Sequence, residues 1–287
     1  MEIEPGTLVA VADLNSDFHG EVFKVKETTH GVNNVVEFVA EAILNCSTSE
    51  VILPSNMLLW WDSSISSSIT FGIGSSVASI ADQSGHGNDG VPSPIFTQQP
   101  DYSATGLNGR PTLVYVNFNQ ALVCDPLAFG TGSTLTCWYV GYFASSSHPD
   151  ARAISYAASG QSFDFDNLQS FAVDRATTTD SVGISRNSNA QISSIAAGYD
   201  TPHRTIATIA ADGTLSIYVN GTTASSSHTG GAFGTNGTFA VGNTGYGGFL
   251  GQGYWHGGIS EVGVSTDASS PAQVAVLDDY LATKWGF

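Results

Sequence analysis

The feature that most constrains the fold is a long series of short, alternating apolar segments from residue 57 onward, each ended by a turn signal. A period of two is typical of half-buried strands, and Asn-Gly or Asp-Gly pairs favour tight hairpins. In residues 214–219, for example, Leu215, Ile217 and Val219 share one face. Because no helical pattern separates these segments, the sequence predicts an all-β, antiparallel β-sandwich of the jelly-roll kind. The turn signals are Asp89-Gly90, Asn108-Gly109, Asp212-Gly213, Asn220-Gly221 and Asn236-Gly237.

One helix is predicted, and it is the last element of the chain. Ser270 is placed to cap it, Pro271 suits its first position, and Gln273 completes a capping box with Ser270. Gly286 is placed to end it. The apolar stripe of this helix consists of Val274, Leu277, Leu281 and Trp285.

The first 50 residues differ from the rest in charge. They hold seven of the eight glutamates and two of the three lysines, on alternating segments that predict two strands around a turn at residues 30–34. A polar stretch with a proline follows, which is typical of a linker. We therefore expect two domains, a small β segment at residues 1–50 and the sandwich at residues 57–287.

The charge balance excludes some partners. Eight Lys and Arg residues against 25 Asp and Glu residues give a formal net charge of −17, so no basic stripe is available to bind nucleic acid. The sequence also lacks an apolar run of the roughly 20 residues that a membrane span needs, and its first residues lack a secretory signal pattern. Cys46, Cys124 and Cys137 form no C-x-x-C pair, and we expect free, mostly buried thiols.

Three segments of the sandwich region carry a resemblance to a known family. They are Leu59-Trp-Trp-Asp-Ser63; Asp82-Gln-Ser-Gly-His-Gly-Asn-Asp-Gly90 with Leu107-Asn-Gly-Arg-Pro-Thr112; and Gly258-Ile-Ser-Glu-Val262 followed by Tyr280-Leu-Ala-Thr-Lys-Trp-Gly286. In this order they resemble the concanavalin A-like, laminin-G-type jelly-roll modules common in phage tail and bacterial surface proteins. The resemblance covers residues 58–287 and implies the fold more than the ligand.

The N-terminal segment carries a second, weaker resemblance. Glu4-Pro-Gly-Thr-Leu-Val-Ala-Val and Gly20-Glu-Val-Phe-Lys-Val resemble the last β-segments of the tail-tip hub proteins of long-tailed phages, with Thr7 in place of an aspartate and Lys24 in place of an arginine. The resemblance implies that residues 1–50 attach the chain to other tail proteins of a virion.

The sequence gives little support for catalysis. Some enzymes with this sandwich fold cleave β-glucans with two glutamates in an E-x-D-x-x-E strand, and the motif is absent here. Beyond residue 50 the only glutamate is Glu261, while Asp164 and Asp166 share a strand face and leave a polysaccharide depolymerase as the lesser alternative. We therefore expect that the protein is not an enzyme.

The glycine-rich loop at residues 82–90 has two interpretations. Asp82, Asn88 and Asp89 offer the oxygen ligands that calcium prefers. The same residue types stabilise turns by bonding to nearby backbone groups, so the loop also fits a purely structural role. No cofactor is required, and calcium is the only candidate.

The segment at residues 242–257 supplies the candidate ligand contacts. It presents Tyr246, Tyr254, Trp255 and His256 on a glycine-rich backbone, and aromatic rings stack on the apolar faces of sugars. The alternative is that these rings, Trp255 above all, belong to the core.

These observations predict a phage tail or tail-tip component, located in the virion, whose sandwich binds host-surface carbohydrate. Several weak sites acting together would give useful avidity, and homo-oligomerisation is left open because no heptad or collagen-like repeat fixes a number of copies. The rival hypothesis is a structural virion protein with protein contacts only.

Overall fold

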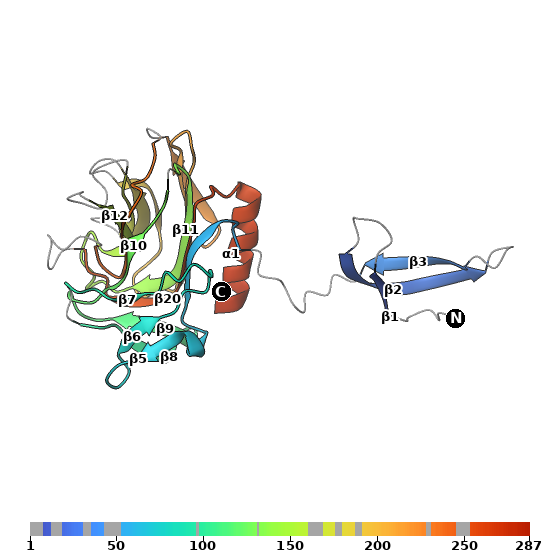
Figure 1. Cartoon of the computed structure of the whole chain (residues 1–287), viewed down its shortest axis with the longest axis horizontal. Helices are drawn as coiled ribbons and strands as arrows, with labels where there is room; N and C mark the ends of the chain where they lie inside the picture. Colours follow the sequence, from blue (N-terminus) through green and yellow to red (C-terminus); the bar gives the residue numbers. More distant parts are fainter. Residues whose placement is uncertain are drawn as a thin grey trace. The chain divides into compact units, whose positions relative to one another are not determined.

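The computed structural model describes three strands within the first 52 residues and, beyond them, residues 53–95, 98–130, 132–159, 169–175, 180–186, 191–227, 231–244 and 253–287. The chain divides into two compact units, Met1–Ile52 and Leu53–Phe287. Figure 1 shows the strands and the helix of both units, coloured from blue at the N-terminus to red at the C-terminus.

The first unit contains a three-stranded antiparallel sheet with the order β1-β2-β3. The hairpin predicted around residues 30–34 is confirmed, because β2 and β3 pair on either side of that stretch. The other edge of β2 pairs with β1, the strand that comes before β2 in the sequence. The strands are β1 (Leu8–Ala12), β2 (His19–His30) and β3 (Val36–Ala42).

The second unit is a two-layer antiparallel sandwich, and the all-β jelly-roll prediction is confirmed. One layer is a seven-stranded sheet with the order β15-β14-β13-β12-β19-β10-β7. Its strands are β7 (Val91–Pro92), β10 (Leu122–Leu127), β12 (Arg152–Ala158), β13 (Phe171–Arg175), β14 (Ser181–Ser185), β15 (Gln191–Ala196) and β19 (Gly237–Val241).

The other layer is an eight-stranded sheet with the order β18-β17-β16-β11-β20-β9-β8, in which β4 also pairs with β20. Its strands are β4 (Met57–Asp62), β8 (Asp101–Leu107), β9 (Arg110–Tyr115), β11 (Leu135–Phe143), β16 (His203–Ile209), β17 (Leu215–Val219), β18 (Thr222–Ser226) and β20 (Gly257–Ser265). A short 3-10 helix (Ser66–Ser68) and a two-stranded sheet, β5 (Ile69–Phe71) with β6 (Val77–Ile80), lie outside both layers.

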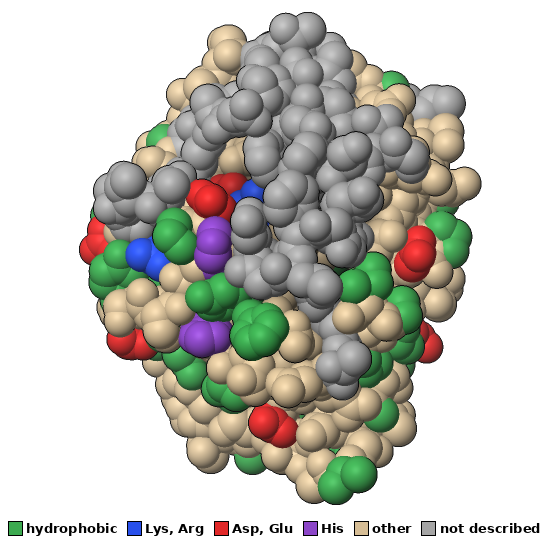
Figure 2. All heavy atoms as spheres, turned by 90° about the vertical axis from the view of Figure 1, so that its left-hand side faces the viewer, with side chains coloured by type: hydrophobic (Ala, Val, Ile, Leu, Met, Phe, Trp, Pro, Cys, Tyr) green, Lys and Arg blue, Asp and Glu red, His purple; other side chains and the backbone are tan. Residues whose placement is uncertain are grey.

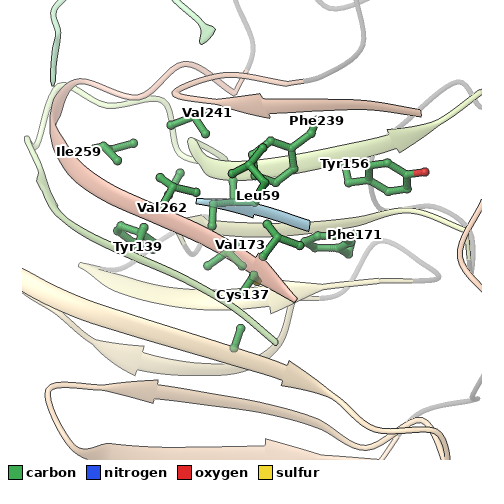
Figure 3. Close-up of a cluster of buried hydrophobic side chains, with 14 of the residues drawn as sticks. Leu59, Cys137, Tyr139, Tyr156, Phe171, Val173, Phe239, Val241, Ile259 and Val262 are labelled. Atoms are coloured by element: carbon green, nitrogen blue, oxygen red, sulfur yellow. The ribbon is translucent and has the colours of Figure 1, made fainter. Parts of the chain in front are cut away.

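The core fills the space between the two sheets, and the alternation of the strands explains how. On β11, Leu135, Cys137 and Tyr139 point into this core, while Trp138 and Val140 belong to a second cluster on the opposite face. A period of two places successive side chains on opposite faces, so both faces of β11 are buried. Figure 3 shows the core side chains converging from both sheets. Those labelled are Leu59, Cys137, Tyr139, Tyr156, Phe171, Val173, Phe239, Val241, Ile259 and Val262.

Helix α1 (Pro271–Trp285) covers the outer face of the eight-stranded sheet, as Figure 1 shows. The predicted helix is confirmed together with its signals: the capping box between Ser270 and Gln273 is formed, and Gly286 ends the helix with φ of 75°. Its stripe packs on the outward side chains of β11 and β16. In the described part of the chain, no helix combines the length and the apolar character that crossing a bilayer demands.

The hairpin signals are confirmed in part. Asn108-Gly109 and Asn220-Gly221 have positive φ at both positions, as a type I′ turn requires, and Asp212-Gly213 connects β16 to β17. Asn236-Gly237 is not a hairpin turn, because Gly237 begins β19, which pairs with β12 and β10 instead of with a sequence neighbour. A Cβ at Gly237 would lie 2.4 Å from the Ala157 carbonyl oxygen, so close strand packing explains this glycine.

The predicted free thiols are observed where the structure describes them. Cys124 and Cys137 are free and buried, and Cys46 lies outside the described residues.

Candidate functional site

The glycine-rich loop at residues 82–90 is held by the Asp82 carboxylate. Its Oδ1 accepts hydrogen bonds from the backbone N–H groups of Trp60 (2.9 Å) and Ser84 (2.9 Å), and its Oδ2 accepts from the Ser84 hydroxyl (2.7 Å) and the Asn88 N–H (3.1 Å). Asp89 Oδ1 accepts from the Asp82 N–H at 2.8 Å. These bonds tie the loop to Trp60 of β4, so the residues act as turn stabilisers.

The same geometry bears on the calcium prediction. Asn88 turns its amide nitrogen toward the Leu58 carbonyl oxygen (2.7 Å), so the amide is used to attach the loop to β4. Among the residues that the structure describes, no group of three His, Cys, Asp or Glu side chains is arranged to hold a metal ion. A cation at Asp82 would compete with four hydrogen-bond donors, and a calcium site there stays a prediction.

Of the four predicted ligand contacts, three are described and Tyr246 lies outside the described residues. Tyr254 and His256 are half-buried, whereas Trp255 between them is fully buried. The Trp255 ring packs edge-on against Tyr139 and Phe143, with centroids 5.7 and 5.4 Å apart, and its indole N–H donates to the Tyr142 carbonyl oxygen at 3.1 Å. Trp255 is therefore a core residue in this structure, and Tyr254 and His256 reach the surface on either side of it.

Tyr254 is the centre of a row of three rings, which we call the aromatic rim: His148, Tyr254 and His256. The ring centroids of His148 and Tyr254 are 5.4 Å apart, and those of Tyr254 and His256 are 5.0 Å apart. His148 comes from the turn between β11 and β12, more than a hundred residues away in the sequence. Sequence reasoning missed His148, because only the pairing of the two segments brings it beside Tyr254.

Backbone hydrogen bonds fix the two segments of the rim to each other. The His148 N–H donates to the Tyr254 carbonyl oxygen (3.2 Å), and the Ala144 N–H donates to the His256 carbonyl oxygen (2.8 Å). The buried hydroxyl of Ser147 donates to the His256 carbonyl oxygen (2.8 Å) and accepts from the His256 N–H (3.0 Å). The rim is thus held on ordered backbone, as a preformed binding surface requires.

The imidazoles of the rim are neutral at pH 7. Burial lowers the pKa of both His148 and His256; for His148 the nearby carboxylate of Asp150 opposes the decrease, and Arg152 and Arg175 reinforce it. His148 Nδ1 accepts from the Asp150 N–H (3.1 Å), so the neutral ring carries its proton on Nε2. The rim therefore offers uncharged polar groups on aromatic rings.

Two arginines stand behind the rim, and the sequence alone did not reveal them. Arg152 begins β12 and Arg175 ends β13, and because these strands are antiparallel both lie at the same end of the seven-stranded sheet. Arg152 Nη1 forms a buried ion pair with Asp174 at 3.1 Å. Figure 2 shows histidine side chains gathered with hydrophobic, acidic and basic ones on one face of the molecule.

Glu261 has a structural role. It is buried under helix α1, and its two carboxylate oxygens accept five hydrogen bonds. The donors are Trp60 Nε1 (2.9 Å), Trp138 Nε1 (3.4 Å), Tyr280 Oη (3.3 Å), Lys284 Nζ (2.8 Å) and Trp285 Nε1 (2.7 Å). The carboxylate therefore joins the sheet to the helix.

Comparisons with known proteins agree with this fold. A family model described as the concanavalin A-like lectin/glucanases superfamily matches residues 115–275, which is more than half of the chain. A search of curated proteins found no match.

Solved structures are similar to this chain at low sequence identity, and the first of them shares its fold. Domain 4 of AbnA, a GH43 extracellular arabinanase from Geobacillus stearothermophilus in complex with arabinotriose, is 12% identical over 78% of this chain and 97% of that chain, with a TM-score of 0.52. A GH54 α-L-arabinofuranosidase mutant is 15% identical over 98% of this chain and 64% of that chain (TM-score 0.48). The CBM40 domain of a Ruminococcus gnavus sialidase, bound to α2,3-sialyllactose, is 14% identical over 54% and 97% (TM-score 0.40).

The prediction that the protein is not an enzyme is wrong, because the sequence does not support that conclusion. It rested on the missing glutamate motif, but this fold also occurs within a glycoside hydrolase, the GH43 arabinanase, and is compatible with such an activity. The absence of one motif therefore does not exclude catalysis. Asp164 and Asp166, the carboxylates considered for it, lie outside the described residues.

Proposed function

The chain belongs to the concanavalin A-like lectin/glucanase superfamily, and from this premise we propose that it binds carbohydrate through the aromatic rim of His148, Tyr254 and His256. The observation that carries the proposal is the row of three partly exposed rings, contributed by two distant segments and fixed by backbone hydrogen bonds. Fold alone does not assign a ligand, so the argument rests on these side chains.

The chemistry of the rim suits a sugar. Sugars present apolar C–H faces that pack on aromatic rings and hydroxyl groups that exchange hydrogen bonds with polar side chains. Tyr254 supplies a ring with a polar tip, and the neutral imidazoles on either side of it supply both donors and acceptors. Ser146, which is exposed and lies 3.0 Å from His256 Nδ1, adds a hydroxyl at the edge of the rim.

The biological ligand that we propose is a glycan of a host cell surface. The resemblance of residues 58–287 to modules of phage tail and bacterial surface proteins supports this, as does the resemblance of residues 1–50 to segments of tail-tip hubs. In this proposal the chain is part of a virion, residues 1–50 attach it to other tail proteins, and several copies bind one surface together. The net charge of −17 suits a protein that must not adhere to nucleic acid.

The experiment that tests the proposal is binding of the full chain to a glycan array that includes arabino-oligosaccharides, sialyllactose and bacterial surface polysaccharides. We expect saturable binding that Tyr254→Ala reduces at least tenfold. Tyr102→Ala is the matched control, because Tyr102 is also half-buried but lies on β8 of the eight-stranded sheet. Equal loss in both variants, or binding to no glycan, would contradict the proposal.

Two additions make the same experiment more informative. Repeating it with EGTA and with added Ca²⁺ measures whether the Asp82 loop contributes a cation that binding requires. Measuring the release of reducing sugar from each bound polysaccharide shows whether binding is accompanied by cleavage.

A further inference from the structure

Arg175 connects the aromatic rim to a tyrosine outside it. Its Nη1 donates to the Ser147 carbonyl oxygen (2.6 Å) and, at 3.5 Å, to that of His148, while its Nη2 donates to the Tyr199 hydroxyl oxygen at 2.6 Å. The side chain is buried, and its guanidinium carbon lies 4.9 Å from the centre of the Tyr199 ring. A planar guanidinium with fixed donor directions holds both partners in place. Tyr199 is therefore held next to the rim by a buried side chain that also bonds to the rim's backbone.

Tyr199 is built into the same end of the sandwich yet remains exposed. The Asp200 N–H donates to the Phe143 carbonyl oxygen at 2.8 Å, which fixes the turn that carries Tyr199 to the end of β11. The ring contacts Phe143 edge-on at 5.7 Å, and 38% of the residue is open to solvent. Phe143 in turn packs on Trp255, the core residue between Tyr254 and His256. Ring contacts thus link Tyr199 through Phe143 to Trp255, which lies between Tyr254 and His256 in the sequence.

Two hydrogen-bond donors result from this arrangement. The Tyr199 oxygen accepts from Arg175, so its own proton points elsewhere, and among the described residues no acceptor for it is found. The Nε2 proton of His148 likewise has no acceptor in the described part of the chain, because Nδ1 is the atom used by the Asp150 N–H. Arg175 contacts the residues that carry both donors, through the Tyr199 hydroxyl oxygen and the His148 carbonyl oxygen, and both donors can bond to oxygen atoms of a ligand.

We propose that Tyr199 and His148 form a second sugar subsite next to Tyr254, so that the ligand is a chain of two or more sugar units and not a single terminal sugar. This inference rests on the proposed function, since it extends the same surface. A sugar stacked on Tyr254 covers an area similar to its ring, and His148 and the Arg175 guanidinium separate that ring from the Tyr199 hydroxyl. In this proposal a second unit of the oligosaccharide reaches the Tyr199 hydroxyl while the first stacks on Tyr254.

The test compares the full chain and its Tyr199→Phe variant on arrays that carry arabino-, xylo-, cello- and galacto-oligosaccharides of one to six units. We expect the affinity of the unmodified protein to rise by about tenfold or more from one unit to three and then level off. Tyr199→Phe keeps the ring but removes the hydroxyl, so it is expected to lose roughly fivefold in affinity for three units and nothing for one unit, as the loss of one neutral hydrogen bond predicts. Tyr102→Phe serves as the control.

The outcomes separate this inference from the proposed function. Binding that is equal for one and three units, or that Tyr199→Phe leaves unchanged for three units, overturns the second subsite while the Tyr254 site stands. Binding to no glycan overturns both. If Tyr199→Phe fails to fold, as judged by its thermal unfolding, the chain-length dependence of the unmodified protein decides alone, and an affinity that does not rise from one unit to three overturns the second subsite.

Discussion

His203 is expected to make the sandwich domain sensitive to mild acid. Its ring is fully buried, with Nε2 2.8 Å from the Tyr139 hydroxyl and Nδ1 3.0 Å from the Thr201 carbonyl oxygen. The carbonyl can only accept, so Nδ1 carries the proton of the neutral ring, and Nε2 accepts from Tyr139. A second proton on this ring would have to displace the Tyr139 hydroxyl proton inside the core.

The magnitude follows from the pKa of this group. Burial lowers the pKa of His203 from 6.5 to about 4, against a smaller opposing effect of the Thr201 carbonyl. The unfolded chain therefore binds the proton more readily than the folded one. The stabilisation from the neutral ring is complete above pH 6.5, falls as the pH decreases below 6.5, and is exhausted near pH 4. At pH 5 the pH lies about 1.5 units below the pKa of this histidine in the unfolded chain, which is therefore largely protonated. The free energy of unfolding is then about 2 kcal/mol lower than at pH 7.

The assay is urea unfolding at pH 7 and pH 5, followed by tryptophan fluorescence. All five tryptophans lie in residues 53–287, so the signal reports on the sandwich. The comparison is with His203→Asn, whose side-chain amide can still donate to the Thr201 carbonyl oxygen but does not titrate. This variant is expected to be less stable at both pH values and to lose about 2 kcal/mol less than the unmodified protein between them.

The comparison isolates His203 from the other titrating groups. His148 and His256, whose pKa values burial also lowers, destabilise the protein in acid with the same sign, but they do so equally in both proteins. Equal losses of unfolding free energy between pH 7 and pH 5 in the two proteins would refute the reasoning, because His203 would then not be the group that remains neutral in the fold.

Two further predictions concern the packing of the eight-stranded sheet. Glu261→Gln replaces one accepting carboxylate oxygen with an amide NH2 group that faces buried donors, and it leaves Asp62 as the remaining charged partner of Lys284. We expect a loss of about 3 kcal/mol of unfolding free energy in the same urea assay, with no change in secondary structure by circular dichroism. Gly263→Ala places a methyl group 2.1 Å from the ring of Trp138, which is fully buried on the neighbouring strand, so a loss of about 2 to 3 kcal/mol or failure to fold is expected. A stable, unperturbed Gly263→Ala protein would mean that Trp138 is not packed between β20 and the helix.

Local signals allowed much of the fold to be predicted. The capping box at Ser270, the left-handed Gly286 and the Asn-Gly turns each depend on residues that are close in sequence, so the chain itself displays them. Asn236-Gly237 misled for a physical reason, since a glycine can be required by close packing between strands as well as by a turn. Sequence cannot distinguish these two demands without knowing which strands become neighbours.

The candidate site was less predictable, because it depends on contacts between distant segments. Tyr254 and His256 were proposed from their own segment, but His148 and Tyr199 come from two other turns, and Arg175 from the end of β13. Nothing in the local sequence of a single histidine or tyrosine marks it as a neighbour of Tyr254.

The place of Trp255 explains why Tyr254 and His256 can form part of a surface at all. In an extended segment the side chains alternate, so burying the middle ring of three directs the outer two toward solvent. Trp255 is fixed by Tyr139, Phe143 and a hydrogen bond to the Tyr142 carbonyl oxygen, all on β11. The same strand end supports Tyr199 through Phe143. The orientation of the proposed binding rings is therefore set from within the core, and Trp255 contributes to the site by holding it, without needing to contact the ligand.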